Sequence, residues 1–134
     1  MTSKDSQPFR VMLIEDEVEY RRIVAELLKR RFPTMLFAEA TNGTEAMEKM
    51  NSFLPRLVVL DIQLPGHDGL HVTRSIKQRY PDVDVVILTA YDFPEYREAA
   101  RVSGASHFLS KGSVTSQEIE NLVEGLWEKR TPVP

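Results

Sequence analysis

Short apolar runs alternate with longer amphipathic stretches along this chain. Continuous apolar runs at residues 11–14, 57–60 and 85–88 are typical of strands that are covered on both faces. Weaker runs at 35–40 and 107–109 predict two further strands. We therefore expect five strands, three of them central in the sheet.

Between these runs, apolar residues recur at helical spacing. The clearest series contains Tyr20, Ile23, Val24, Leu27 and Leu28, at positions i, i+3, i+4, i+7 and i+8. The same spacing returns over residues 119–127, and shorter patterns predict helices around 46–50, around 72–80 and after Pro94. Each predicted strand is thus followed by one predicted helix.

Three helix starts carry capping-box pairs, in which a Thr, Asp or Asn precedes a Glu by three residues. The pairs are Asn42 with Glu45, Asp92 with Glu95, and Thr115 with Glu118. We expect the second, fourth and fifth helices to begin at these pairs.

Five strand–helix units predict an α/β fold with a parallel sheet and right-handed crossovers. Five strands suit an open, doubly wound sheet of order 2-1-3-4-5, which is a (βα)5 flavodoxin-like three-layer sandwich. We expect one domain over residues 9–129, a disordered segment at 1–8 and a linker-like tail at 130–134.

Composition narrows the class of protein. The 134 residues are 42% hydrophobic and 28% charged, the balance of a soluble globular domain. No cysteine is present, which excludes disulfides, thiol catalysis and thiolate metal sites. The apolar runs are too short to cross a bilayer, the first eight residues do not resemble a signal peptide, and the formal charge is −3. We expect a cytoplasmic domain without membrane or direct nucleic-acid contact.

Chemically useful residues follow four of the predicted strands. Glu15 and Asp16 follow the first, Asp61 the third and Thr89 the fourth, while the fifth leads to Lys111. In an open parallel sheet the carboxyl ends of the strands share one edge, and ligands bind there. These side chains should therefore converge on one cleft.

The expected cleft holds three carboxylates and one ammonium, a balance of −2. An octahedral dication with oxygen ligands, such as Mg²⁺, matches this charge and these ligands. Mg²⁺ on carboxylates commonly serves phosphate chemistry. Lys111 could then pair with one phosphoryl oxygen, and the Thr89 hydroxyl could donate to another.

Purely structural interpretations compete at each position. Asp16 could simply cap the first helix, because Asp is a favoured N-cap residue. Lys111 could be a structural ion-pair partner of Asp61, which follows a wholly apolar run and needs compensation. His67, His71 and His107 share no metal-ligand spacing, so we expect them at or near the surface and not as ligands.

Four segments together carry a resemblance to a known family. IEDE at 14–17, LDIQLPGHDG at 60–69, LTA at 88–90 and SK at 110–111 look like the receiver domain of two-component response regulators. The resemblance extends from about residue 9 to residue 129. It implies a phosphorylation-activated signalling switch that catalyses only its own phosphorylation and dephosphorylation and has no external substrate.

The resemblance also implies a role for each matching residue. Asp61 would accept a phosphoryl group from the phosphohistidine of a sensor histidine kinase or a phosphotransfer protein. Asp16, Asp61 and the backbone carbonyl of Gln63 would bind Mg²⁺ directly, and Glu15 would act through water. Thr89 and Lys111 would hold the phosphoryl oxygens. Phe108 would turn inward when Thr89 moves toward the phosphate.

The implied output surface combines the fourth helix, the fifth strand and the last helix. It would serve homodimerisation or docking of an output partner. Tyr96, Ala99 and Ala100 are the inward residues expected of the fourth helix, a small apolar stripe that anchors it weakly. This helix is therefore the element expected to shift.

The chain departs from the usual family pattern at two positions. Glu15 replaces the commoner aspartate, and Gly112 replaces the proline that usually follows the lysine. Since a non-proline cis peptide costs about 3 kcal/mol, we expect a trans bond before Gly112 and a differently shaped loop. The Lys-Gly-Ser sequence, with residues 37–42, is more similar to receivers that precede LuxR-type helix-turn-helix domains, so the output could be transcription.

Three other functions remain for comparison. A haloacid-dehalogenase phosphatase needs Asp-x-Asp, but Gln63 stands at the second position. A flavodoxin-like FMN binder needs a Ser/Thr/Gly-rich loop after the first strand, where residues 15–17 are all acidic. A receiver-like interaction module without chemistry would not need Asp16, Asp61, Thr89 and Lys111 together.

Overall fold

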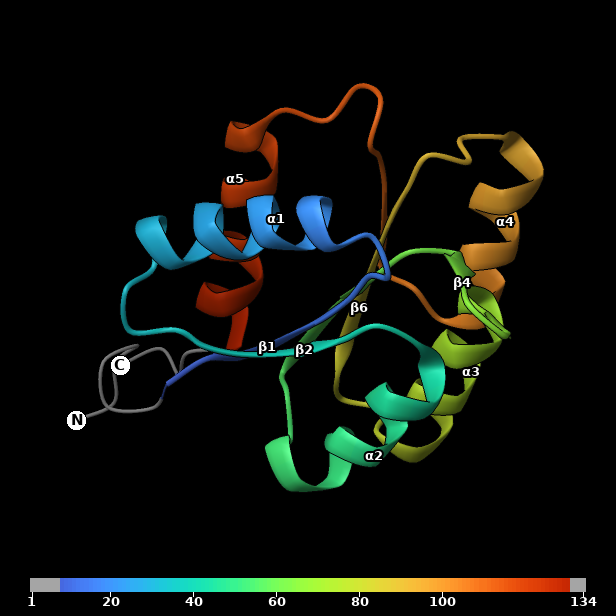
Figure 1. Ribbon diagram of the computed structural model, residues 1–134, viewed down its shortest axis with the longest axis horizontal. Helices are drawn as coiled ribbons and strands as arrows, with labels where there is room; N and C mark the ends of the chain where they lie inside the picture. The colour runs from blue at the N-terminus through green and yellow to red at the C-terminus, as the bar shows by residue number, and fades with distance from the viewer. Residues whose placement is uncertain (1–7, 131–134) are drawn as a thin grey trace.

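One parallel sheet forms the centre of the molecule in the computed structural model, which describes residues 8–130 (Figure 1). Its strands are β1 (Arg10–Ile14), β2 (Leu36–Ala40), β3 (Leu57–Leu60), β6 (Asp84–Thr89) and β7 (His107–Ser110). They lie in the order β2-β1-β3-β6-β7, and every pairing is parallel. In the order of these five strands along the chain this is 2-1-3-4-5, so the predicted topology is confirmed.

The helices form a layer on each face of the sheet. α1 (Val18–Arg31) and α5 (Ser116–Arg130) cover one face, and α2 (Gly43–Phe53), α3 (Gly69–Arg79) and α4 (Pro94–Ser103) pack on the other (Figure 1). Successive side chains of a strand alternate between these layers. In β1, Val11 and Leu13 join the α1/α5 core, while Met12 and Ile14 join the core beneath α2, α3 and α4.

The ends of the chain lie mostly outside the described residues. Of the segment 1–8, expected to be disordered, only Pro8 is described, and it is exposed. α5 continues through Arg130, the first residue of the expected linker-like tail, and residues 131–134 are not described.

One of the three predicted capping boxes is complete, since Thr115 and Glu118 bond each other's backbone amides. Asn42 is also the N-cap of α2 and accepts from the Glu45 amide at 2.8 Å, but the Glu45 carboxylate accepts from the Thr41 amide and not from that of Asn42. The prediction for Asp92 is wrong, because α4 begins at Pro94 and takes Phe93 as its N-cap. Proline suits the first helical position, since it lacks the N–H that would go unpaired there.

A short hairpin was not anticipated from the sequence. β4 (Gln63–Leu64) and β5 (His67–Asp68) pair antiparallel in the connection between β3 and α3. Gly66 turns the hairpin with a φ of 69°, in the left-handed region that favours glycine. Asp68 then caps α3 by accepting from the Leu70 amide at 2.9 Å.

α4 has a narrower buried face than the sequence predicted. Ala100 is buried and Ala99 half-buried, but Tyr96 remains 37% exposed, so its assignment as an inward residue is wrong. The Tyr96 ring instead contacts two other exposed rings, Tyr91 at 6.1 Å and Phe93 at 6.0 Å between centroids. The buried anchor of α4 is therefore limited to small residues such as Ala100 and Ser103.

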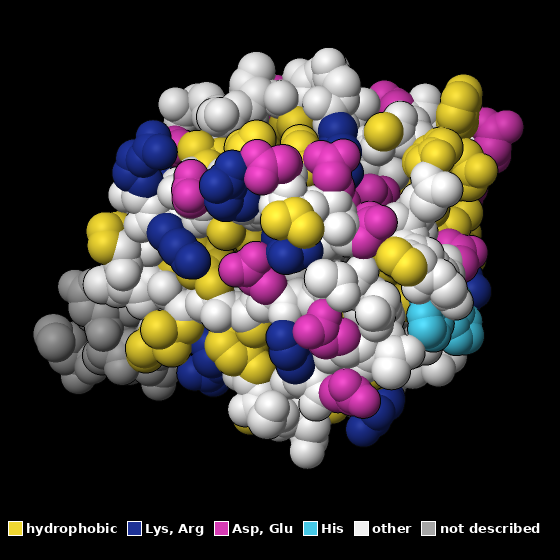
Figure 2. Space-filling view, viewed as in Figure 1, with side chains coloured by type: hydrophobic (Ala, Val, Ile, Leu, Met, Phe, Trp, Pro, Cys, Tyr) yellow, Lys and Arg dark blue, Asp and Glu magenta, His cyan; other side chains and the backbone are white. Residues whose placement is uncertain are grey.

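On the face shown in Figure 2, acidic and basic side chains are interspersed and do not gather into patches of one sign. No helix within residues 8–130 is long and apolar enough to cross a membrane.

Candidate functional site

A cleft of about 480 Å³ opens at the carboxyl edge of the sheet. Its charged lining consists of Glu15, Asp16, Glu17, Asp61 and Lys111. Its other lining residues are Gln63, Leu64, Pro65, Ala90 and Tyr91. The sequence predicted four of the five charged residues; Glu17 adds a fourth carboxylate, so the formal charge is −3 where −2 was expected.

Lys111 holds the two buried carboxylates together. Its Nζ lies 2.7 Å from Glu15 Oε1 and 3.0 Å from Asp61 Oδ2, and both carboxylate side chains are only 9% exposed. No buried side-chain nitrogen or oxygen within the described residues lacks a hydrogen-bond partner. The ion pair considered from the sequence is therefore present, and it includes Glu15 as well as Asp61.

Burial controls the electrostatics of this cluster. It raises the pKa of Glu15, and the hydrogen bonds from Lys111 and the Glu17 amide oppose this only in part. Burial also disfavours the charged form of Lys111, but the bonds to Glu15 and Asp61 outweigh it and raise the Lys111 pKa. The ammonium therefore stays charged at neutral pH, in a cleft that is rich in anions.

The backbone around Asp61 is tightly enclosed. Asp61 Oδ1 accepts from the Gln63 amide at 3.2 Å, and the Gly69 amide donates to the Ile62 carbonyl at 2.6 Å. A Cβ on Gly69 would lie 2.1 Å from the Asp61 carbonyl oxygen. This contact was not predicted from the sequence. The available signal was a glycine directly after the cap of a helix, where a better helix former is expected.

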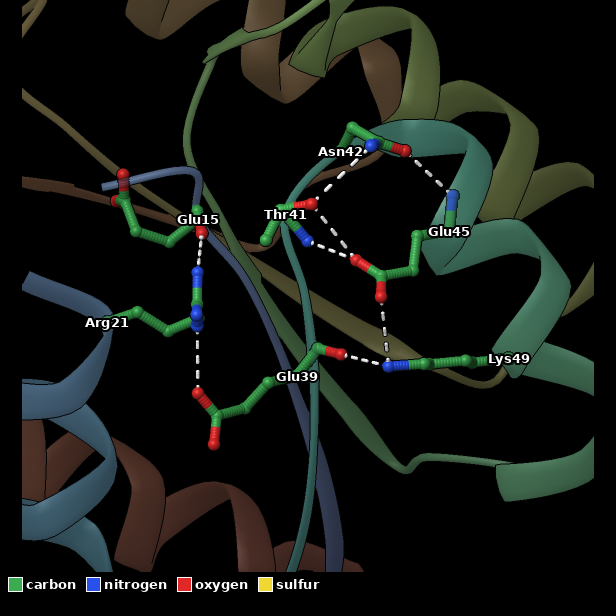
Figure 3. A network of polar contacts seen from close by, with 7 residues as sticks. All are labelled: Glu15, Arg21, Glu39, Thr41, Asn42, Glu45 and Lys49. Carbon is green, nitrogen blue, oxygen red and sulfur yellow. Dashed lines mark hydrogen bonds and ion pairs between the residues drawn. The ribbon is translucent and has the colours of Figure 1, made fainter. Parts of the chain in front are cut away.

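A polar network braces the loop that carries the acidic residues (Figure 3). Arg21 Nη1 donates to the Glu15 carbonyl at 2.6 Å, and its Nε donates to Glu39 Oε1 at 2.8 Å. Lys49 Nζ donates to the Glu39 carbonyl and pairs with Glu45. Arg21 of α1, whose side chain is only 15% exposed, thus fixes the residue after β1 to β2, and Lys49 fixes β2 to α2.

Thr89 reaches the correct edge of the sheet but not the lining of the cleft. It is fully buried, and its Oγ1 accepts from the Tyr91 amide at 3.3 Å. Its carbonyl accepts from the Lys111 amide at 2.9 Å, which ties β6 to the residue after β7. The hydroxyl would have to turn away from Tyr91 to reach a ligand in the cleft.

Phe108 is half-buried and packs against the core beneath α2, α3 and α4. The guanidinium of Arg97 lies over its ring, 4.7 Å from the centroid, and Arg97 Nε also donates to Asp92 Oδ1 at 2.6 Å. Phe108 therefore combines partial core packing with a charged contact from α4.

The residues expected to bind metal share the cleft but do not form a preassembled cage. Within the described residues, no three His, Cys, Asp or Glu side chains are grouped as metal ligands. Glu15 and Asp61 are paired with Lys111, while Asp16 is exposed. The available donors, carboxylates and the Gln63 carbonyl, are nevertheless the oxygen ligands that Mg²⁺ prefers. The donor set fits this ion, which would have to compete with Lys111.

Other expectations concern the surroundings of the cleft. His67, His71 and His107 are all exposed, and none lines it. All peptide bonds of the described residues are trans, including the one before Gly112. Tyr91 and Gln63 lie in the lining, which is where residues that control access of water would have to be.

Comparison with known proteins identifies this arrangement. Residues 11–124 match the response regulator receiver domain. The chain is 31% identical over 110 residues to the transcriptional activator ExaE of Pseudomonas putida, covering 82% of this chain and 51% of ExaE. It is 32% identical over 127 residues to the response regulator MprA of Mycolicibacterium vanbaalenii, covering 93% of this chain and 53% of MprA. The chain thus spans about half the length of these relatives.

Solved structures agree with the sequence comparisons. A LuxR-family two-component response regulator from Aurantimonas sp. is 29% identical, with a TM-score of 0.83 over 92% of this chain and 88% of that one. The signal receiver domain of NarL from Mycobacterium tuberculosis is also 29% identical, with a TM-score of 0.80 over 92% and 98% of the two chains. From its sequence match, its sheet order and these relatives, the chain belongs to the response regulator receiver domain family.

Proposed function

We propose that this domain is a phosphorylation-activated switch of a two-component system and that Asp61 is its phosphoacceptor. The observation that carries the proposal is the position of Asp61, a buried carboxylate at the end of β3 that contacts Lys111 in an acidic cleft. Asp61 would attack the phosphorus of a phosphohistidine, forming an O–P bond as the P–N bond breaks and the imidazole leaves. The donor would be a sensor histidine kinase or a phosphotransfer protein.

The residues around Asp61 suit the charge that this transfer develops. Lys111 is within reach of the same oxygen and can contact a phosphoryl oxygen as the carboxylate charge is lost. Asp16, Asp61 and the Gln63 carbonyl would hold Mg²⁺, with Glu15 acting through water. When bound, the ion would neutralise charge on the transferring group. Thr89 would supply a hydroxyl after it releases the Tyr91 amide.

The output would be a change in the surface formed by α4, β7 and α5, used for homodimerisation or for docking a partner. Thr89 and Phe108 would couple this surface to the phosphate. Relatives named as transcriptional regulators support control of transcription as the output of this surface. The domain would turn over no external substrate and would act in the cytoplasm. Four carboxylates at the cleft also argue against binding of FMN, because they would repel its phosphate.

The test is phosphorylation by a small donor. Purified protein is incubated with acetyl phosphate and Mg²⁺, and its intact mass is measured before and after alkaline treatment. We expect a gain of one phosphoryl group that alkali removes, and no gain in the Asp61→Asn variant. Equal phosphorylation of that variant would refute the assignment of Asp61. A folded wild-type protein that gains no mass would favour a module that acts without phosphoryl chemistry.

A further inference from the structure

Lys111 has a third neighbour, which is uncharged. Its Nζ lies 4.4 Å from the centroid of the Tyr20 ring, in addition to its contacts with Glu15 and Asp61. Tyr20 belongs to the first turns of α1, is half-buried and packs against the core beneath α1 and α5. The helix and the core therefore fix the face of the ring that the ammonium meets.

The position of the Lys111 ammonium depends on such contacts, because the backbone fixes only the start of this long side chain. Four methylene groups separate the ammonium from the main chain, and the next residues, Gly112 and Ser113, are exposed in a turn. One backbone bond, from the Lys111 amide to the Thr89 carbonyl, fixes the start of the side chain. The position of Nζ is therefore set by the groups around it.

The ring side of the cluster has little room for water. Tyr20, Glu15, Asp61 and Arg21, together with apolar side chains, line a cavity of about 10 Å³, which is the lower limit for one water molecule. A cation is attracted more strongly to an aromatic face when water is excluded. Burial raises the pKa of Tyr20, so the ring remains a neutral phenol beside the ammonium.

We propose that Tyr20 is a positioning residue for Lys111, which holds the ammonium at the cleft while the carboxylates beside it change charge. This inference rests on the proposed function. Phosphorylation removes the charge of the Asp61 carboxylate and places the negative charge on the phosphoryl oxygens, and binding of a cation competes for Glu15. The attraction of the Tyr20 ring does not depend on either event, so it persists when both ionic contacts weaken. It keeps Nζ within reach of a phosphoryl oxygen.

The first experiment measures the rate of phosphorylation by acetyl phosphate in two variants of Tyr20. Tyr20→Phe keeps the ring and removes only the hydroxyl, so its rate should stay within about twofold of wild type. Tyr20→Leu keeps an apolar side chain without an aromatic face, and its rate should fall about 3- to 10-fold. Tyr20→Met serves the same purpose should the leucine variant fail to fold.

Tyr80→Leu is the matched control. Tyr80 is also half-buried and also meets a cation, with the Arg79 guanidinium 5.5 Å from its ring centroid, but it ends α3 and does not line the cleft. Its loss should reduce stability without changing the phosphorylation rate. A rate in Tyr20→Leu equal to that in Tyr80→Leu would overturn the proposal, as would an equal loss of rate in Tyr20→Phe and Tyr20→Leu.

The second experiment needs neither metal nor phosphate. Equilibrium unfolding of metal-free wild type, Tyr20→Leu, Lys111→Met and the double variant forms a thermodynamic cycle. We expect a coupling of about threefold or more in the unfolding equilibrium constant, and additive effects would show that ring and ammonium do not interact. Failure of wild-type phosphorylation would refute the proposed function, whereas normal wild-type phosphorylation with no coupling would refute the role of Tyr20 alone.

Discussion

Replacing Gly69 by alanine tests whether the backbone of the phosphoacceptor loop must be held as tightly as the structure shows. Gly69 is the first residue of α3, and its φ is not in the left-handed region, so alanine meets no conformational strain there. The obstacle is steric. The added Cβ would lie 2.1 Å from the Asp61 carbonyl oxygen and 2.7 Å from Ile62 Cα, well inside the 3.4 Å at which ordinary contact begins.

Both nearby atoms belong to the backbone, so they cannot turn aside as a flexible side chain could. The loop after β3 must move by roughly 1 Å, which we expect to cost about 1–3 kcal/mol of folding free energy. The same shift displaces Asp61 from Lys111. A misplacement of this size at a reacting group commonly lowers a rate about 100-fold. The variant should therefore lose more activity than its stability alone explains.

Gly125→Ala provides the control. Gly125 lies within α5, and no atom stands within 4 Å of the Cβ it would gain. Alanine there should raise stability by about 0.5–1 kcal/mol and leave phosphorylation unchanged. Both variants are compared by urea unfolding and by initial rates with acetyl phosphate. A Gly69→Ala protein that matches wild type in both measurements would refute the steric reasoning.

Four further expectations concern the cleft and its surroundings. Saturating Mg²⁺ should raise the melting temperature of the wild type, and Asp16→Ala should remove most of this rise. The control is Glu19→Ala, which removes an exposed acid of α1 outside the cleft and should keep the rise. A wild-type melting temperature that does not change with Mg²⁺ would contradict the metal site. Tyr91→Ala should shorten the half-life of the acyl phosphate, which is measured as the loss of the phosphoryl group over time. Unchanged half-lives in both Tyr91→Ala and Gln63→Ala would show that these side chains do not control the access of the hydrolytic water. The pKa of Glu15 is raised above 4.5 in the folded protein, so folding favours its protonated form. The free energy of unfolding of the metal-free wild type should therefore fall relative to that of Glu15→Gln as the pH rises from 4.5 through the raised pKa. A relative rise in that free energy over the same pH range would contradict the raised pKa. Arg97→Ala should speed amide exchange in α4 and β7 more than Arg101→Ala, which removes an ion pair on the same helix but no ring contact.

The centre of the sheet could be predicted because β1, β3 and β6 are buried on both faces and appear as unbroken apolar runs. The edge strands β2 and β7 are only partly buried, and their runs are weaker. The alternation of strands with helices predicted a parallel sheet. The same logic brought Glu15, Asp61 and Lys111 together, since each follows a strand of one parallel sheet. Topology alone was sufficient for this, without knowledge of any side-chain contact.

Side-chain contacts between different helices, strands and loops could not be predicted from the sequence. Tyr20 was assigned to the apolar stripe of its helix, where its core packing is real, but nothing in the spacing shows that its ring also faces Lys111. Arg21 lies next to that stripe, and its guanidinium donates to the carbonyl of Glu15, the first residue after β1. The close approach of Gly69 to Asp61 depends on how α3 enters after the hairpin. The wrong prediction of Asp92 as an N-cap has a local cause, because Pro94 is a favoured first residue of a helix and α4 begins there.

The loop between β6 and α4 offers a physical route from the cleft to the output surface. The Thr89 hydroxyl accepts from the Tyr91 amide, and the Tyr91 ring contacts Tyr96 in the first turn of α4. One residue beyond Tyr91, Asp92 holds Arg97, whose guanidinium covers the ring of Phe108. If Thr89 turns toward a phosphoryl oxygen, the Tyr91 amide loses its acceptor and the loop loses a tether. Movement of Asp92 would then draw Arg97 from Phe108, so the aromatic side chain and α4 would be released by one event. Since the buried residues of α4 are small, a modest bias between two states would be enough to move it under the function that we propose.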